Sequence, residues 1–494
     1  MNLNPVLTIL GWALTFLAVM MFFPMLFAFD GHPILTSGAF LMSAILTLFL
    51  GGGLVFASRR EYTAMERRHS FMIVTLVWVV VPFFAAMPFY LSGVTPNFLD
   101  AYFEALSGFT TNGASVLQDV SSMPKSILLW RALLEWFGGF SLIIMLSILA
   151  TTVNDLATNS LGRAIAKSNR RRLSRRVRYA VLSVFGVYSL LSVICIFLLW
   201  MSGMSAFEAI CYSFSTISTG GFMITNGGVE IFANNMVELV LMIFMVIGAL
   251  DFALHWAFFN GNRSAYFSNP EYRYLVYAIV AMTLGMFLIL MVNTHITVLD
   301  GLRHAIFNSV SALTTTGYTM RPISDGAVYW PASFVYFMLL AATIGGSSGS
   351  TAGGMKLIRF ILLFKLAVNE VRRLSFPRAV ILLKIGKERV TKDNILSTWA
   401  FFALYVFTIL FVSLGLALTG LDMESSYTLA IANIANAGSM VSLDMMAQFS
   451  EDSHFLSYFD LSNLAKVILC VAMLLGRLEF FAVLALFNPA LWRR

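Results

Sequence analysis

Long apolar segments follow one another along almost the whole chain. Ten of them reach about twenty residues, the length that a helix needs to cross a bilayer. Four shorter apolar stretches of about ten residues lie between them and are too short to cross. The pattern predicts an all-α polytopic membrane protein. The ten long segments are residues 6–29, 38–57, 71–92, 127–150, 180–202, 236–259, 274–292, 330–364, 397–419 and 464–487.

Each short stretch runs into a polar turn that closes on glycine, and a long segment follows. The first three turns read S-G-F-T-T-N-G, S-T-I-S-T-G-G and S-A-L-T-T-T-G, and the fourth, A-N-I-A-N-A-G, is a degenerate copy. This repeat predicts four pseudo-equivalent units around one central pore, preceded by an N-terminal two-helix hairpin. The hairpin is expected at residues 1–60 and the units at 70–152, 178–262, 272–368 and 395–488.

The residue types in these turns suit a dehydrated monovalent cation. Backbone carbonyls can replace its hydration oxygens without binding it too tightly, and glycine allows the φ values that aim successive carbonyls at one axis. No turn contains a carboxylate, which argues against a site selective for divalent ions. The alternative is that the turns are re-entrant loops without any role in ion binding. The predicted filter residues are Thr110, Thr111, Asn112, Gly113, Ser218, Thr219, Gly220, Gly221, Thr314, Thr315, Thr316, Gly317, Ala435, Asn436, Ala437 and Gly438.

A glycine-rich run interrupts the long segment at 330–364. A continuous helix there would lose about 1 kcal/mol for each glycine relative to alanine, so we expect the helix to break. The break predicts a flexible loop below the third turn that gates the path, although close helix packing through small residues is the alternative. The loop residues are Gly345, Gly346, Ser347, Ser348, Gly349, Ser350, Thr351, Ala352, Gly353 and Gly354.

Arg477 lies about fifteen residues into the last apolar segment, near mid-depth, where an ionisable residue is a functional candidate. In the pore it would act as an electrostatic barrier to cations. A structural ion pair with Glu135 or Asp251 is the alternative. Asp251 and His255 share a helix face, and we favour hydrogen bonding between helices over a metal or proton site, since two ligands are too few to define a metal.

Composition and charge place the chain in a membrane with a defined orientation. The 494 residues are 59% hydrophobic and 12% charged, against about a quarter charged in soluble proteins. Of the 32 Lys and Arg, 26 fall in segments 58–69, 152–178, 260–275, 356–394 and 493–494, which thread to one side of the bilayer. The positive-inside rule makes that side cytoplasmic and puts both termini there. Membrane-flanking basic loops also explain the charge without nucleic-acid binding. The N-terminal segment lacks the features of a cleaved signal peptide.

The motifs taken together resemble the Trk/Ktr superfamily of bacterial potassium transporters. Besides the turns, the matching segments are W-R-A-L-L-E-W-F-G-G at 130–139, D-F-A-L-H at 251–255, G-G-S-S-G-S-T-A-G-G-M-K at 345–356, P-R-A-V at 377–380 and L-G-R-L-E at 475–479. The resemblance implies K⁺ uptake across the bacterial inner membrane, K⁺ binding at the filter residues, and no organic cofactor. It also implies a homodimer and a cytosolic nucleotide-binding regulatory ring of TrkA type. The fourth turn departs from the family, because Ser439 follows Gly438 where proline is often found.

Two other classes of function were weighed. An ion-coupled secondary carrier would need broken helices in two halves and acidic residues at mid-depth. Only one long segment is clearly interrupted in the sequence, and the turns lack acids, so we favour the pore. An enzyme would need a catalytic cluster, and none of the six histidines lies in one.

Overall fold

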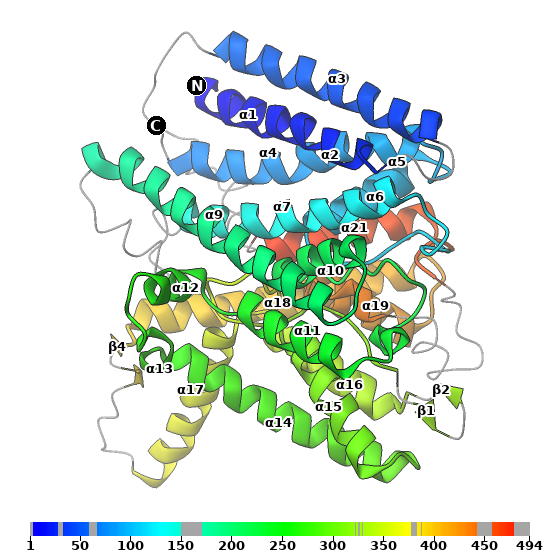
Figure 1. The fold of residues 1–494 in the computed structure, drawn as a ribbon. Coiled ribbons are helices and arrows are strands. Elements are labelled where there is room, and N and C mark those ends of the chain that lie inside the picture. Colours follow the sequence, from blue (N-terminus) through cyan, green and yellow to red (C-terminus); the bar gives the residue numbers. More distant parts are fainter. Residues whose placement is uncertain are drawn as a thin grey trace.

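The computed structural model describes residues 3–27, 33–58, 67–149, 170–321, 323–324, 327–328, 330–376, 383–386, 388–441 and 457–478. These residues are mainly helical, as predicted (Figure 1). Seven helices or helix pairs are long and apolar enough to span a membrane, and one sharply bent pair makes an eighth candidate within the described residues. The strands form two short antiparallel hairpins, β1 (Ile323–Ser324) with β2 (Ala327–Val328) and β3 (Lys384–Ile385) with β4 (Glu388–Arg389).

The N-terminal hairpin consists of α1 (Asn4–Met20), α2 (Phe22–Met25) and α3 (Pro33–Ser58) and lies along one side of the molecule (Figure 1). Gly11 and Gly51 allow its two long helices to meet closely, because a Cβ on either would lie 2.8–3.0 Å from the other's carbonyl oxygen. Small residues bring helix backbones together in this way in membranes. A hydrogen bond of 2.8 Å from Thr8 to Ser58 joins the same two helices.

Four units follow, each with a long helix, a short helix, a turn and a further helix. The first contains α4 (Arg67–Ala85), α5 (Met87–Leu91), α6 (Phe98–Phe109) and α7 (Lys125–Leu149). The second contains α9 (Arg170–Met201), α10 (Ala206–Ser218), η1 (Val229–Phe232), α11 (Asn235–Gly248) and α12 (Phe252–Phe259). The third contains α13 (Ala265–Ser268), α14 (Pro270–Asn293), α15 (Val298–Leu313), α16 (Ala332–Ile344) and α17 (Leu357–Ser375). The fourth contains α18 (Lys392–Ala417), α19 (Met423–Ile434), η2 (Gly438–Met440) and α21 (Asn463–Arg477).

The helix after each turn packs against the short helix of the next unit. α7 packs on α10, α11 on α15, and α16 on α19. α21 then returns to α6, so the fourth unit closes on the first. This cyclic order brings the carboxyl ends of the four short helices together.

Side-chain caps begin all four short helices. The N-cap residues Asn97, Ser205, Thr297 and Asp422 each accept a hydrogen bond from a backbone N–H in the first turn. Ser205 and Glu208 form the capping box predicted from the sequence. Each cap satisfies an N–H that helix geometry leaves without a partner.

The prediction of one continuous span at residues 236–259 is wrong. α11 and α12 meet at 100°, and Asp251 caps the start of α12 through a 3.0 Å bond from the Ala253 N–H. The segment at residues 345–356 supplies hydrogen-bond partners for backbone groups at this break. The Ala249 carbonyl accepts from the Ser347 N–H at 2.9 Å, and the Phe252 N–H donates to the Gly349 carbonyl at 3.2 Å. These contacts lie about a hundred residues apart in sequence, so the local pattern could not reveal the break.

Candidate functional site

The four turns share one backbone geometry. In each, an N–H donates to a carbonyl five residues earlier and the residue before that N–H has a left-handed φ, which is the Schellman ending of a helix. The left-handed residues are Thr111, Thr219, Thr315 and Asn436, with φ of 51–54°. The bonds run from Asn112 to Ser107, Gly220 to Ser215, Thr316 to Ser311 and Ala437 to Ala432, at 2.8–3.0 Å. The fourth turn, degenerate in sequence, therefore keeps the fold of the other three.

Three of these left-handed residues are threonines, whose β-branched side chains disfavour that conformation. Strained backbone of this kind persists where the surroundings impose it, and it clusters at functional sites. The closing glycines Gly113, Gly221 and Gly317 are also left-handed, with φ of 75°, 89° and 82°. Gly438 is not, and it starts the 3₁₀ helix η2 instead. In these φ angles, the fourth turn therefore departs from the others at its last residue.

The closing glycines show that the turns form a closed ring. A Cβ on Gly113 would lie 2.2 Å from the Gly220 carbonyl oxygen, and a Cβ on Gly221 would lie 2.0 Å from the Thr316 carbonyl oxygen. A Cβ on Gly317 would meet Ser439, and one on Gly438 would meet the Asn112 side chain. Each turn thus contacts the next, and the fourth contacts the first.

Ser439 occupies the centre of this ring. Its Oγ lies 2.8, 2.2 and 1.9 Å from the positions that Cβ atoms on Gly113, Gly221 and Gly317 would take. The hydroxyl therefore touches three walls while its backbone belongs to the fourth. It donates a 3.2 Å hydrogen bond to the Thr316 carbonyl, and the Ser439 N–H donates to the Asn112 carbonyl at 3.2 Å.

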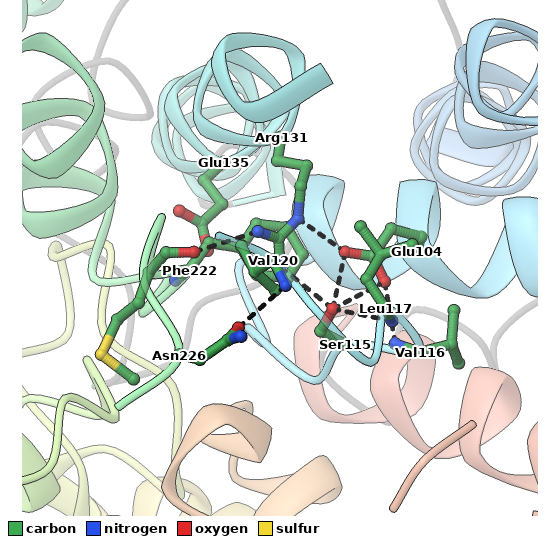
Figure 2. Close-up of polar contacts among 10 residues, drawn as sticks. Glu104, Ser115, Val116, Leu117, Val120, Arg131, Glu135, Phe222 and Asn226 are labelled. Carbon is green, nitrogen blue, oxygen red and sulfur yellow. Dashed lines mark hydrogen bonds and ion pairs between the residues drawn. The ribbon is translucent and has the colours of Figure 1, made fainter. Parts of the chain in front are cut away.

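The buried ion pair of Arg131 and Glu104 contacts the segments that follow the first two turns (Figure 2). The Arg131 Nε donates to Glu104 at 2.7 Å, and its Nη1 donates to the Met223 carbonyl just beyond the second turn at 3.0 Å. Glu104 also accepts from the Ser115 hydroxyl and the Val116 N–H beyond the first turn. One ion pair thus fixes the irregular segments that follow two different turns.

Glu135 lies directly behind the second turn and has no exposed surface. One carboxylate oxygen accepts from the Phe222 N–H at 2.9 Å, while the other has no hydrogen-bond partner among the described residues. A Cβ on Gly220 would lie 2.4 Å from this carboxylate, so side chain and turn are in close contact. Further out, Asn226 donates to Asp119, and this hydrogen bond lowers the pKa of the Asp119 carboxyl.

The loop at residues 345–356, between α16 and α17, reaches three turns directly. The Thr219 hydroxyl contacts Thr351 at 3.3 Å, and the Gly353 N–H donates to the Thr315 Oγ1 at 2.6 Å. The Gly354 N–H donates to the Ala435 carbonyl at 3.0 Å. The predicted loop residues are therefore packed against the turns.

Glu271, at the start of α14, anchors the other end of this loop. Its carboxylate accepts hydrogen bonds from the Ser347 hydroxyl, from the Ser348 hydroxyl and from the Ser348 N–H, the last at 3.0 Å. Glu271 is buried, so these bonds satisfy a carboxylate that burial would otherwise penalise.

Arg477 connects the loop to the first turn. Its Nε donates to the Thr110 carbonyl at 2.5 Å and its Nη1 donates to the Thr351 carbonyl at 2.8 Å. No ion pair joins Arg477 to Glu135 or Asp251 in the part of the chain that the structure describes. A cavity of about 20 Å³ beside it is lined by Lys356 and Arg359 and has room for about one water molecule.

Among the described residues, Asp251 and His255 belong to no group of three side chains that could hold a metal ion. His255 instead contacts the Tyr266 hydroxyl at 2.7 Å and the Ile247 carbonyl at 3.0 Å, linking α11, α12 and α13. Asp251 caps its own helix.

The structure thus brings together the predicted turn residues, the loop and Arg477. Sequence reasoning missed Glu271 and the place of Glu135 behind the second turn. It noted Ser439 as a departure without seeing that its side chain lies inside the ring. A charged residue within an apolar segment was the signal for Glu135, whereas Glu271 lies in a polar stretch just before the segment at 274–292 and gave no such signal.

Comparison with known proteins identifies the family. A family model described as TrkH, a cation transport protein, matches residues 36–494. The chain belongs to the TrkH family. Its similarity to the Trk system potassium uptake protein TrkH of Halomonas elongata is 33% identity over the whole of both chains. TrkH of Escherichia coli K12 is 32% identical over 92% of each chain.

The crystal structure of the potassium transporter TrkH from Vibrio parahaemolyticus has a similar fold. Its TM-score is 0.87 with 31% identity, and the match covers all of both chains. The predicted family and the all-α multi-pass architecture are therefore confirmed. Membership of the TrkH family also confirms a transport protein rather than an enzyme.

Proposed function

We propose that this chain takes up K⁺ through a channel-like pore in the bacterial inner membrane. The closed ring of four turns is the observation that carries the proposal. It places carbonyl-bearing irregular backbone at the meeting point of four short helices, and such backbone is tolerated in a membrane where it lines a path. The names of the TrkH relatives, which describe potassium uptake proteins, support K⁺ as the ion.

In this proposal residues 110–113, 218–221, 314–317 and 435–438 are the selectivity filter. The short helices point their carboxyl ends at it, and the partial negative charge there favours a cation. The 345–356 loop is the gate in this proposal, and its contacts with three of the filter turns support that role. Arg477 adds an electrostatic barrier, since its buried guanidinium lies between the filter and the gate.

Growth of a K⁺-uptake-deficient bacterium at low K⁺ tests the filter. Alanine at Gly113, Gly221 or Gly317 combines a left-handed φ with a clash below 2.3 Å against the next wall, so each variant should fail to restore growth. Gly52→Ala is the matched control, because a Cβ there meets no atom within 4 Å. Full growth with all three filter variants would refute the assignment.

An ion-coupled carrier, driven by Na⁺ or H⁺, is the second candidate. The sequence showed one interrupted segment, at residues 345–356, and the structure adds the break between α11 and α12. Two interrupted helices are a feature of alternating-access carriers, so the structure favours this candidate more strongly than the sequence alone. Single-channel currents in a planar bilayer would support the pore. Uptake that stops when the Na⁺ and H⁺ gradients are removed would support the carrier.

We also propose a homodimer that binds a cytosolic, nucleotide-binding ring of TrkA type. Family membership supports this assembly, and the four units within one chain mean that the dimer is not needed to complete a pore. The mass of the purified complex, measured by light scattering with and without the ring protein, tests it. The predicted cytoplasmic position of both termini concerns residues that lie outside the described ones.

A further inference from the structure

A second cavity, outside the ring of turns, has a volume of about 470 Å³. Residues of α14, of α17 and of the β3–β4 hairpin with the residue before it line this cavity, and Figure 1 labels these elements. Pockets that bind small molecules range from about 300 to 1,000 Å³, so this one has room for a ligand. It is part of neither the ring of turns nor the loop.

One side of this cavity is cationic. Lys365, Arg372 and Lys384 line it, and none of the described lining residues is acidic. Lys365 is held in place, because its Nζ donates to the Lys384 carbonyl at 3.0 Å and lies 5.3 Å from the Tyr274 ring centroid. The acidic Glu370 on the same helix pairs with Arg373 at 3.0 Å, and neither of these two residues lines the cavity. The cavity therefore presents positive charge to an anion.

The other side is apolar and aromatic. Phe360 and Phe364 line it with 39% and 64% of their surfaces exposed, and Val368 continues the same face of α17. An acidic protein segment would pair with the cations but leave this wall uncovered. A neutral lipid would cover the wall but leave three cations unpaired. Only an amphiphile with an anionic head matches both sides.

We propose that this cavity binds an anionic phospholipid, with its phosphate at Lys365, Arg372 and Lys384 and an acyl chain along Phe360 and Phe364. The placement in the cytoplasmic leaflet rests on the membrane orientation of the proposed function. Because α17 starts directly after the 345–356 loop, Lys365 lies only about 12 Å along the helix from it. Lipid occupancy would therefore bias the position of the gate.

Native mass spectrometry of the purified full chain, titrated with phosphatidylglycerol or phosphatidylcholine, tests the site. The triple variant Lys365→Gln, Arg372→Gln, Lys384→Gln should bind phosphatidylglycerol about tenfold or more weakly. Arg373→Gln, which removes a charge from the same helix but not from the cavity, should bind like wild type.

Three results would overturn the proposal. The first is unchanged phosphatidylglycerol binding in the triple variant, and the second is phosphatidylcholine binding as tight as that of phosphatidylglycerol. The third is displacement of bound phosphatidylglycerol by inorganic phosphate or an acidic peptide as effectively as by phosphatidylglycerol itself. The assay measures no ion flux, so its failure would leave the proposed pore untouched, and failure of the pore would leave lipid binding standing.

A separate observation, the Ser439 hydroxyl inside the ring, carries a second inference, which rests on the proposed filter. Its Oγ fills space that exists only because three walls have glycine at that level. We infer that Ser439 determines ion specificity. An ion at the level of the closing glycines must either take this hydroxyl as a ligand or displace it from the Thr316 carbonyl.

Uptake kinetics of K⁺ and Na⁺ in proteoliposomes test the role of Ser439. Ser439→Ala keeps the Cβ but removes the oxygen, so the KM for K⁺ should rise several-fold. Ser439→Gly removes both, so the maximal rate and the share of Na⁺ should rise. The control Ser426→Ala removes a buried hydroxyl of α19 that has no partner among the described residues. Wild-type KM and selectivity in both Ser439 variants, while the glycine variants lose uptake, would overturn this inference alone.

Discussion

Adding a single methyl group at Gly353 tests whether the 345–356 loop closes the path. A Cβ on Gly353 would lie 2.0 Å from the Ala435 carbonyl oxygen, whereas ordinary contacts begin at 3.4 Å. Loop and turn must therefore separate by about 1.4 Å, the difference between these distances. The φ of Gly353 is not left-handed, so alanine adds the clash without backbone strain.

Overpacking of this kind costs about 1–3 kcal/mol. Only the state in which the loop rests on the fourth turn bears that cost, so the closed state loses it relative to the open one. A change of about 1–3 kcal/mol corresponds to a shift of about 5- to 150-fold in the gating equilibrium. Gly353→Ala should therefore raise flux by a factor in that range, up to the limit set by full opening.

Rubidium uptake into proteoliposomes, without any cytosolic partner, measures the effect. Size-exclusion chromatography confirms that the variant is folded, and Gly52→Ala again serves as the control. Folded Gly353→Ala with wild-type or slower uptake would refute the assignment of the loop as the gate. Deletion of several loop residues should raise flux in the same assay.

Three further variants probe the charges around the site. Arg477→Ala should speed uptake because it removes a cation from the path and frees the loop from the first turn; normal folding with slower uptake would contradict the barrier. Glu135→Ala should leave the buried Phe222 N–H unpaired, at a cost of about 1–3 kcal/mol, and increase inhibition of K⁺ uptake by Na⁺, whereas Glu135→Gln keeps an acceptor and should resemble wild type. Lys466→Met should lower the melting temperature markedly, because it leaves Asp100, its partner at 2.6 Å, as an unpaired buried charge that costs about 3–5 kcal/mol. Adding Asp100→Asn should restore much of the loss, and a flat melting temperature in the single variant would contradict this account.

Local patterns were sufficient to predict most of the architecture. Segment length located seven of the ten predicted spans as helices long enough to cross a membrane in the described part of the chain. The repeated turns located the residues that come together. The capping box at Ser205 and the interruption at Gly345 were also visible, because capping and helix breaking depend on neighbouring residues.

Features that depend on distant segments were not predictable. The break between α11 and α12 is stabilised by Ser347 and Gly349, which supply its backbone partners. Burial of Glu271 and Glu135 is tolerated only because serines and an N–H from other segments reach them. The central position of the Ser439 side chain follows from the cyclic order of four units, which no single turn contains.

The closed ring has a consequence for how such a site changes over generations. In an assembly of four identical chains, one codon change alters every wall at once, and the whole set of ion ligands changes together. Here each wall has its own codons, so one substitution alters a quarter of the ring and, in the proposed filter, would leave three walls to hold the ion. Gly438 and Ser439 already differ from their counterparts while the ring stays closed. The ion specificity of the proposed filter could therefore change one wall at a time, through separate mutations.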